Sequence, residues 1–237
     1  MRQGGDSFLD RDGGSVLQLM IQSIHQNAKH LSEIDGAAGD GDHGINMDKG
    51  VLKCAERLRV NPKGFIEGLS TLGDVLLSEI GGSIGPLYGT FFQEMADAGR
   101  GESRIDSSVL GRMLDRATAA VNDLSGAELG DKTMMDALIP AVTAFSQTAV
   151  SEAGFCAALR AMSDAAEQGK ESTRNMVAKV GRSSRLGERS RGVLDAGASS
   201  CALLLTSMAE GIAAIVSKAS QPLPAAPRPV RRLPGRK

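Results

Sequence analysis

The chain has 237 residues, with 27 basic and 28 acidic side chains and a formal net charge of −1. This balance provides no field that would attract nucleic acid or an anionic membrane surface. Aromatic residues make up 3% and Trp is absent, which disfavours a nucleic-acid site built on base stacking. The sequence also predicts no signal peptide and no membrane span. We therefore expect a cytoplasmic protein that has neither nucleic acid nor a membrane among its partners.

Three cysteines, Cys54, Cys156 and Cys201, lie far apart in apolar sequence. A disulfide framework or a zinc cluster needs closer, paired spacing. We expect buried free thiols, in keeping with a reducing compartment.

Apolar residues recur every three to four positions along most of the chain, which predicts helices and no strand. We expect a flexible polar segment over residues 1–14, one helical domain over 15–220, and a disordered tail over 221–237 that is rich in Pro and Arg. The helices are expected at about 15–31, 45–60, 65–80, 86–98, 108–124, 131–150, 151–169 and 171–180, with a final, mostly apolar helix over 198–218.

Several residues are expected at helix ends. Ser15 and either Ser107 or Ser108 are candidate N-caps, and Asp131 is expected to open a helix. Pro86 suits the first position of a helix. Pro140, inside a helical pattern, predicts a kink.

Asp35, Asp40 and Asp42 lie within eight residues and are interleaved with glycines. Carboxylates this close repel one another, so a fold that gathers them favours a bound cation. Oxygen ligands without Cys favour Mg²⁺ or Ca²⁺. The alternative is a solvated turn rich in Asp and Gly. An EF-hand is excluded because Val51 stands where the loop needs Glu, and a Rossmann loop is excluded because a helix precedes the glycines.

Three further segments have features that favour the binding of an anion. The run Gly81-Gly-Ser-Ile-Gly-Pro86 leads into a helix start, where free N–H groups favour phosphate. A simple turn between two helices, the second starting at Pro, explains this run equally well. Lys132, beside Asp131, is placed to meet a phosphate, although the sequence of this segment favours ordinary helix capping by Asp131. Residues 181–197 contain Arg182, Arg185, Arg189 and Arg191, which suit phosphate or a solvated loop, and Asp195 is a candidate cap for the last helix. An up-and-down helical bundle would bring such loops to one end, which predicts a metal–phosphate site there.

The sequence from about Ser15 to Ser217 resembles the L subunit of dihydroxyacetone kinase. The resemblance rests on Asp35-Gly-Ala-Ala-Gly-Asp-Gly-Asp-His-Gly-Ile-Asn46, Gly81-Gly-Ser-Ile-Gly-Pro-Leu-Tyr-Gly-Thr-Phe-Phe92, Gly130-Asp-Lys-Thr-Met134, and Gly181-Arg-Ser-Ser-Arg-Leu-Gly-Glu-Arg-Ser190 with Asp195-Ala-Gly-Ala198. It implies an all-α fold, an antiparallel barrel of about eight amphipathic helices with the nucleotide site at one end. The family usually has Pro where this chain has Ala196, and a small residue where it has Ile84.

The resemblance also implies the ligands and the site residues. Asp35, Asp40 and Asp42 would hold two Mg²⁺ ions that bridge the phosphates of ADP or ATP, and no residue of this chain would act as a nucleophile. The implied nucleotide-binding residues are His43, Gly44, Ile45, Asn46, Ser83, Gly126, Met134, Arg182, Asp195 and Gly197.

The activity implied is phosphoryl transfer to a short ketose held by a separate K-type subunit, so this chain would be half of a glycerone kinase. A phosphotransferase-system phosphocarrier could be a further partner, and the resemblance leaves a homodimer open. The alternatives are a kinase subunit for a four-carbon ketose or a fatty acid, and a nucleotide-loaded module that binds a transcription regulator.

Overall fold

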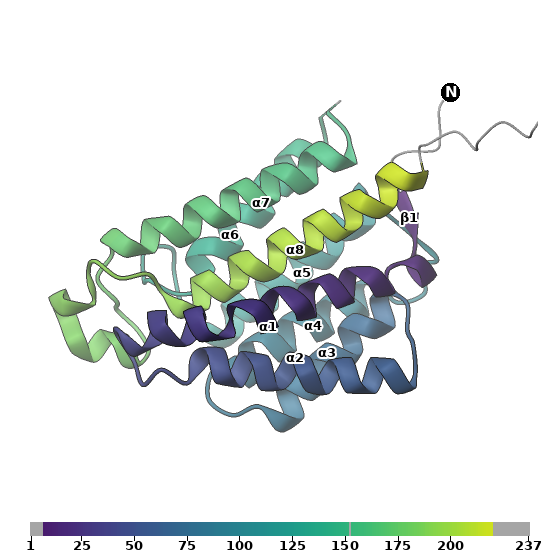
Figure 1. The fold of residues 1–237 in the computed structure, drawn as a ribbon. Helices are drawn as coiled ribbons and strands as arrows, with labels where there is room; N and C mark the ends of the chain where they lie inside the picture. Colours follow the sequence, from purple (N-terminus) through teal and green to yellow (C-terminus); the bar gives the residue numbers. More distant parts are fainter. Residues whose placement is uncertain (1–6, 152, 220–237) are drawn as a thin grey trace, which may run out of the picture.

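The computed structural model describes residues 7–151 and 153–219, and α-helices dominate this part of the chain (Figure 1). The predicted all-α class is confirmed. The helices are α1 (Gly14–Gly36), α2 (His43–Val60), α3 (Phe65–Glu79), α4 (Ile84–Gly99), α5 (Ser107–Ser125), α6 (Met135–Ala149), α7 (Phe155–Ser172) and α8 (Ala196–Ala219), with short 3₁₀ helices η1 (Asp10–Asp12), η2 (Thr173–Asn175) and η3 (Arg182–Ser190) and strands β1 (Ser7–Leu9) and β2 (Arg104–Asp106).

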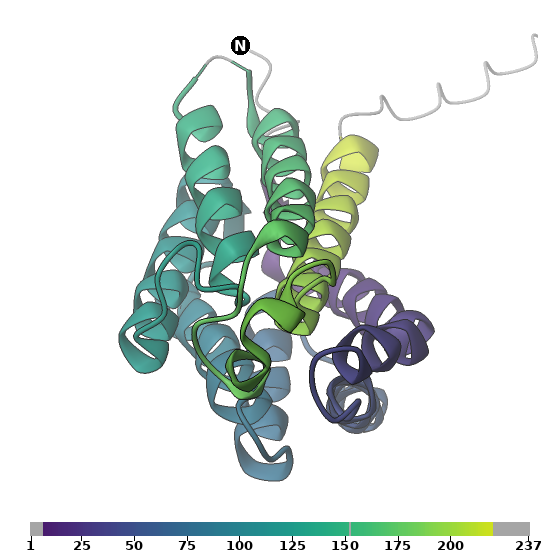
Figure 2. The ribbon, with the colours of Figure 1, turned by 90° about the vertical axis from the view of Figure 1, so that its left-hand side faces the viewer.

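The α-helices run up and down. Each packs against its successor along the chain, and α8 packs against α1. Odd-numbered helices therefore end, and even-numbered helices begin, at one end of the molecule, where the α1–α2 connection and η3 lie (Figure 2). The predicted meeting of the loops at one end is confirmed, whereas the closed barrel stays a prediction.

Helix α8 has an apolar composition because it lies inside the bundle, against α1, α6 and α7. Among the described residues it is the one helix long and apolar enough to cross a membrane, but 67% of its most apolar stretch is buried in the protein. Side chains such as Leu205, Met208 and Ile212 are almost fully buried there. Packing in the core thus accounts for its hydropathy.

A two-stranded antiparallel sheet lies at the opposite end of the molecule, where Phe8 pairs with Ile105. Phe8 is buried and its ring packs edge-on against Phe65, with ring centroids 5.5 Å apart. The predictions of a flexible N-terminus and of no strand are therefore wrong for residues 7–14, because strands of three residues are too short to show a period of two. Residues 1–6 and the predicted disordered tail at 221–237 lie outside the described residues.

Helix boundaries differ from the expected ones in ways that reflect local hydrogen bonding. Helix α1 begins at Gly14 and Ser15 does not cap it; its Oγ donates to the carbonyl of Asp12. Helix α5 is capped by Asp106, whose Oδ1 accepts from the N–H of Val109 at 2.9 Å, in place of Ser107 or Ser108.

Two further expectations need correction. Pro86 is the third residue of α4 and not the first. Helix α6 begins at Met135, after a turn that contains Asp131, and Pro140 lies inside it as expected. No helix follows over residues 171–180, because α7 ends at Ser172 and only the short η2 succeeds it.

The cysteines are free thiols, as predicted. Cys54 and Cys201 are buried, and burial raises the pKa of each to about 12. Cys156 is only partly buried, against expectation.

Candidate functional site

A cavity of about 580 Å³ opens at the end of the molecule where the loops meet. This volume lies within the range of small-molecule sites. Four segments that are distant in sequence line it: the α1–α2 connection, the α3–α4 connection with the start of α4, residues 124–135, and residues 180–183 with 195–197. These are the four segments that the sequence singled out for metal or phosphate.

The beginnings of α2, α4, α6 and α8 contribute residues to the cavity wall. Backbone N–H groups in the first turn of a helix lack partners within the helix, and the helix dipole favours a negative ligand there. Ser83 and Asp42 occupy the N-cap positions of α4 and α2, and neither side chain caps its helix. The wall therefore offers N–H donors suited to an anion such as phosphate.

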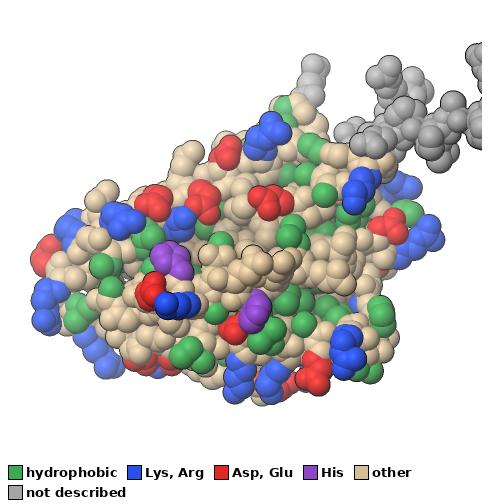
Figure 3. Space-filling model, in the orientation of Figure 1, with side chains coloured by type: hydrophobic (Ala, Val, Ile, Leu, Met, Phe, Trp, Pro, Cys, Tyr) green, Lys and Arg blue, Asp and Glu red, His purple; other side chains and the backbone are tan. Residues whose placement is uncertain are grey.

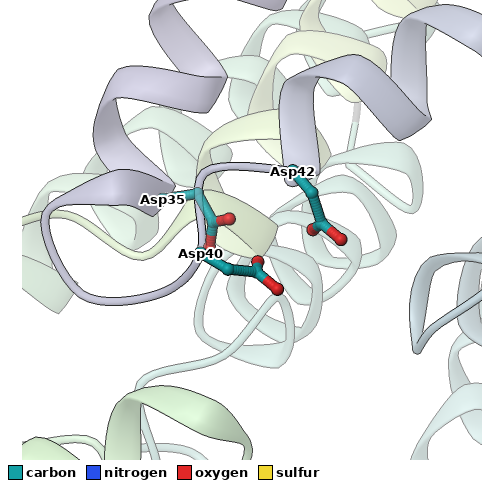
Figure 4. A group of neighbouring side chains, drawn as sticks. All are labelled: Asp35, Asp40 and Asp42. Carbon is teal, nitrogen blue, oxygen red and sulfur yellow. The ribbon is translucent and has the colours of Figure 1, made fainter.

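Three carboxylates face one side of the α1–α2 connection (Figure 4). Oxygen atoms of Asp35, Asp40 and Asp42 lie within 4.8 Å of one another. Asp35 belongs to the last turn of α1 and not to the loop, so the helix fixes the position of one carboxylate of the group. The side chains of Asp40 and Asp42 are 49% and 50% exposed, which leaves them open to a cation from solvent.

Backbone geometry holds this connection in place. Gly41 has φ of +79°, a backbone conformation that favours glycine. A Cβ on Gly39 would lie 2.6 Å from Oδ1 of Asp35, so a larger residue would displace that carboxylate. The N–H of His43 donates to Oδ2 of Asp35 at 3.3 Å and ties the start of α2 to the end of α1.

Arg182, from η3, approaches the same carboxylates. Its guanidinium forms an ion pair with Asp40, and Nη1 lies 3.9 Å from Oδ2 of Asp42. Three clustered, accessible carboxylates without a sulfur ligand fit Mg²⁺, which commonly takes one or two carboxylates and completes its shell with water and phosphate oxygens. Arg182 would supply positive charge beside them.

A buried polar network forms part of the cavity floor. Nε2 of His43 lies 2.8 Å from Oγ of Ser200, which lies 2.6 Å from the hydroxyl of Tyr88. That hydroxyl donates to the carbonyl of Gly197 at 2.9 Å. The network connects α2, α4 and α8 beneath the site, and it gives the buried Tyr88 hydroxyl the partners that burial requires.

The sequence predictions did not include Tyr88 or Ser200. Tyr88 offered one signal, because it is the only tyrosine in the chain and lies within the Gly81 motif. Ser200 offered none, since a serine inside an apolar helix usually bonds to its own backbone.

Burial shifts the pKa values of His43 and Asp195 in opposite directions. Desolvation lowers the pKa of His43 to about 4, so its imidazole is neutral at pH 7. Desolvation raises the pKa of Asp195 to about 6. Asp195 caps α8, because its Oδ2 accepts from the N–H of Ala198 at 2.7 Å, as the sequence predicted.

Most of the residues predicted to bind nucleotide or metal line this one cavity. They are Asp35, Asp40, Asp42, His43, Asn46, Ser83, Met134, Arg182, Asp195 and Gly197.

Three predicted residues do not line the cavity. Gly44 is buried against α1, where a Cβ would lie 1.9 Å from the carbonyl oxygen of Ala28. Ile45 is 65% exposed. Gly126 is the C-cap that follows α5, with φ of +59°, and it lies between two residues that do line the cavity.

Lys132 is at the cavity wall, but its amine does not face outward. The residue is 2% exposed, and Nζ donates to the backbone carbonyls of Met176, Ser190 and Val193. The expectation that Lys132 meets a phosphate is therefore not supported by its geometry. Of the four late arginines only Arg182 lines the cavity, while Arg191 pairs with Glu188.

Comparison with known proteins assigns the chain to a family. A model of the DAK2 domain matches residues 37–210. The chain is 38% identical over 202 residues to the ADP-binding subunit DhaL of PEP-dependent dihydroxyacetone kinase 2 from Listeria innocua, covering 84% of this chain and 93% of that protein. It is 38% identical over 185 residues to the corresponding DhaL subunit of Escherichia coli, covering 77% and 87%.

A crystal structure of the dihydroxyacetone kinase of C. freundii in complex with AMP-PNP and Mg²⁺ is similar in fold, with a TM-score of 0.62 and 25% identity. The match covers 83% of this chain and 33% of that longer one. The family model and the two bacterial subunits, which the chain matches over nearly their whole length, show that it belongs to the DAK2-domain family, as a relative of the DhaL subunits of dihydroxyacetone kinase.

Proposed function

We propose that this chain is the nucleotide-binding subunit of a dihydroxyacetone-type kinase. It would hold ADP or ATP through two Mg²⁺ ions on Asp35, Asp40 and Asp42, and pass a phosphoryl group to a short ketose held by a separate K-type subunit. A phosphocarrier of the phosphotransferase system would recharge the bound ADP if the chain works as relatives named PEP-dependent do. The fatty-acid and regulator-binding alternatives gain no support from the relatives.

The observation that carries the proposal is the convergence of three groups on one cavity: a carboxylate triad, a guanidinium and the beginnings of four helices. Carboxylates alone would repel the phosphates of a nucleotide. A triad that binds metal and donors that bind phosphate oxygen become compatible when a divalent cation lies between them.

The chain's own groups suit phosphoryl transfer more than covalent catalysis. Phosphoryl transfer relies on positioning and on neutralising charge. Bound magnesium would supply most of that neutralisation. Arg182 and the N–H groups at the start of α4 are placed to hold phosphate oxygens, while the buried network under Tyr88 fixes the helices that carry them.

A substitution of Asp40 tests the metal link. Asp40→Asn removes one charged ligand from an exposed position, so we expect the protein to fold and its Mg²⁺-dependent affinity for ADP to fall by roughly tenfold or more, which corresponds to about 1.4 kcal/mol. Titration calorimetry in Mg²⁺ and in EDTA measures this. Asp164→Asn, an exposed carboxylate on α7, is the matched control. Unchanged ADP affinity in Asp40→Asn would refute the metal bridge.

Reconstitution tests the partner and the phosphoryl donor. The protein is mixed with a K-type subunit and either dihydroxyacetone or erythrulose, with ATP alone or with phosphoenolpyruvate and the phosphocarrier proteins. Turnover only with the phosphocarriers supports the proposed recharging of ADP, and turnover with ATP alone shows nucleotide exchange instead. The faster ketose identifies the acceptor. No turnover with either donor contradicts the kinase proposal.

A further inference from the structure

Lys132 has a backbone and a burial that are both unusual. It is the only non-glycine residue with positive φ, at +64°, in the part of the chain that the structure describes. Its side chain is almost wholly buried, at 2% exposure for the residue. A buried amine is costly unless its N–H groups are satisfied, and a left-handed backbone is strained for a residue with a Cβ. Both features persist only where strong contacts hold the residue in place.

The amine of Lys132 has three hydrogen bonds, all to backbone carbonyls. Nζ donates to Met176 at 3.3 Å, to Val193 at 2.7 Å and to Ser190. An ammonium group has three N–H donors and no acceptor, so these contacts use its whole capacity. It therefore has no donor left for a phosphate in this arrangement.

These three carbonyls lie at the two ends of one segment, residues 176–193, which we call the arginine segment. It leaves η2, carries Arg182 to the carboxylate triad and returns toward α8. Lys132 thus joins the start of the segment to its end. We call these three hydrogen bonds the Lys132 clamp. Lys and Arg side chains lie at this end of the molecule and at the opposite end as well (Figure 3). Within the arginine segment, η3 is the one helical element.

Other hydrogen bonds also hold the two ends of the arginine segment, and one of them runs from Nη1 of Arg191 to the carbonyl of Asn175. The N–H of Ala178 donates to Oγ of Ser190 at 2.9 Å, that of Lys179 to the carbonyl of Asp131 at 3.1 Å, and that of Gly192 to the carbonyl of Arg174 at 2.8 Å. These amides report on whether the segment keeps its conformation, because each exchanges with solvent only when its bond opens.

We propose that Lys132 is a positioning residue, whose amine holds the arginine segment in the conformation that places Arg182 beside Asp40 and Asp42. The inference rests on the proposed function for its effect on nucleotide binding, but the clamp itself does not. The two can therefore fail separately.

The test replaces Lys132 by Met in the full chain, which keeps an unbranched side chain of similar length and removes all three donors. Hydrogen exchange is measured on the nucleotide-free protein. We expect amides of residues 176–193 to exchange on the order of tenfold faster, while amides of α3 keep their rates. Affinity for Mg²⁺–ADP should fall as well, because Arg182 loses its fixed position.

Two further variants make the result decisive. Lys170→Met removes an amine of α7 that lies outside the arginine segment, is 19% exposed in its side chain and pairs with Glu167, so it should leave the exchange of the segment nearly unchanged. Lys132→Gln retains N–H donors and should give an intermediate rate. It also serves as the test variant if Lys132→Met does not fold.

Three outcomes would overturn the inference. Wild-type exchange across 176–193 in both Lys132 variants would show that the amine does not hold the segment. A loss of ADP affinity with unchanged exchange would assign Lys132 a direct contact to phosphate. Faster exchange in every helix alike would show a general loss of stability. If wild-type protein fails to bind Mg²⁺–ADP, the proposed function fails, and the exchange result still decides the clamp.

Discussion

Arg182 and the carboxylate triad have opposite charges at the same mouth of the cavity, so the guanidinium lies where a cation would be attracted. Its side chain is 57% exposed and pairs with Asp40. An exposed ion pair of this kind contributes about 0.2–1 kcal/mol. A divalent cation must compete with this ion pair. In the absence of cation and nucleotide, Arg182 is thus the counter-ion of Asp40.

Replacing Arg182 should therefore affect metal and nucleotide in opposite directions. Arg182→Ala is expected to bind Mn²⁺ about 1.5- to 5-fold more tightly in the absence of nucleotide, a factor that follows from the strength of such a pair. Its affinity for Mg²⁺–ADP should fall. Electron paramagnetic resonance at fixed ionic strength measures free Mn²⁺, with Arg185→Ala as the control, since Arg185 does not line the cavity. Weaker Mn²⁺ binding by Arg182→Ala would contradict the competition.

His43 and Asp195 should give opposite pH dependences to stability. The pKa of His43 is about 4 in the folded protein against 6.5 ordinarily, so the unfolded chain binds more protons between these values and stability falls as pH drops from 6.5 to 4. The pKa of Asp195 is about 6 against 3.8, so the folded protein binds more protons and stability falls as pH rises from 3.8 to 6. Between pH 4 and 6 the two contributions offset each other.

Single substitutions should expose each contribution. Relative to wild type, Asp195→Asn should gain stability as pH rises from 4 to 6, and His43→Gln should lose it, each on the order of 2 kcal/mol over this interval. Urea unfolding in metal-free buffer at several pH values measures both. Parallel pH profiles for the two variants would show that these groups are not buried as described.

At the scale of elements, close backbone approach explains why Gly44, which the family resemblance assigned to nucleotide binding, is a glycine. Gly44 packs α2 onto α1, and a Cβ there would lie 1.9 Å from the carbonyl oxygen of Ala28 and 2.7 Å from the backbone nitrogen of Ser32. Backbone atoms cannot move aside as a flexible side chain can. The two helices must separate if the glycine is replaced.

Gly44→Ala should accordingly destabilise the protein by about 1–3 kcal/mol or more, in the range for overpacked interiors. Gly81→Ala is the control, because a Cβ at Gly81 meets nothing within 4 Å. Free energies of unfolding in urea compare the two. A Gly44→Ala protein as stable as Gly81→Ala would show that α1 and α2 do not approach this closely.

Sequence patterns predicted the long helices well, but they failed for the short strands and for some helix ends. Periodicity located the long amphipathic helices, because each buries one face in the core. It missed β1 and β2, and it extended helical structure past Ser172, where only η2 follows. The predicted N-cap at Ser15 was wrong, because hydrogen bonds at a helix start depend on backbone angles that residue type does not determine.

At the scale of the whole molecule, the carboxylate triad and most of the cavity wall could be predicted because each motif is local and alternate loops of an up-and-down bundle meet. The network of Tyr88 and Ser200 could not be predicted, since it joins helices through contacts that only the tertiary structure creates. Lys132 shows the same limit: a lysine in a loop suggests an exposed charge, and only the fold turns its amine inward.

The segments that connect α1 with α2, α3 with α4, α5 with α6, and α7 with α8 all contribute residues to the cavity. A ligand bound there should therefore stabilise the entire fold. At a concentration 100 times its Kd, Mg²⁺–ADP should add about 2.7 kcal/mol, which raises Tm by about 5–10 °C for a protein of this size. Differential scanning calorimetry in Mg²⁺ and in EDTA measures the shift. An equal shift in EDTA would mean that the nucleotide binds without metal.

The sheet end of the molecule has a consequence for engineering. Strand β1 packs against α8, and the connection between α6 and α7 lies at that same end, away from the cavity (Figure 1). The described ends of the chain are thus near one another. A circular permutant that joins them by a short linker and opens between α6 and α7 would keep the start of every even-numbered helix at the cavity, and fusion partners attached there would leave its mouth clear.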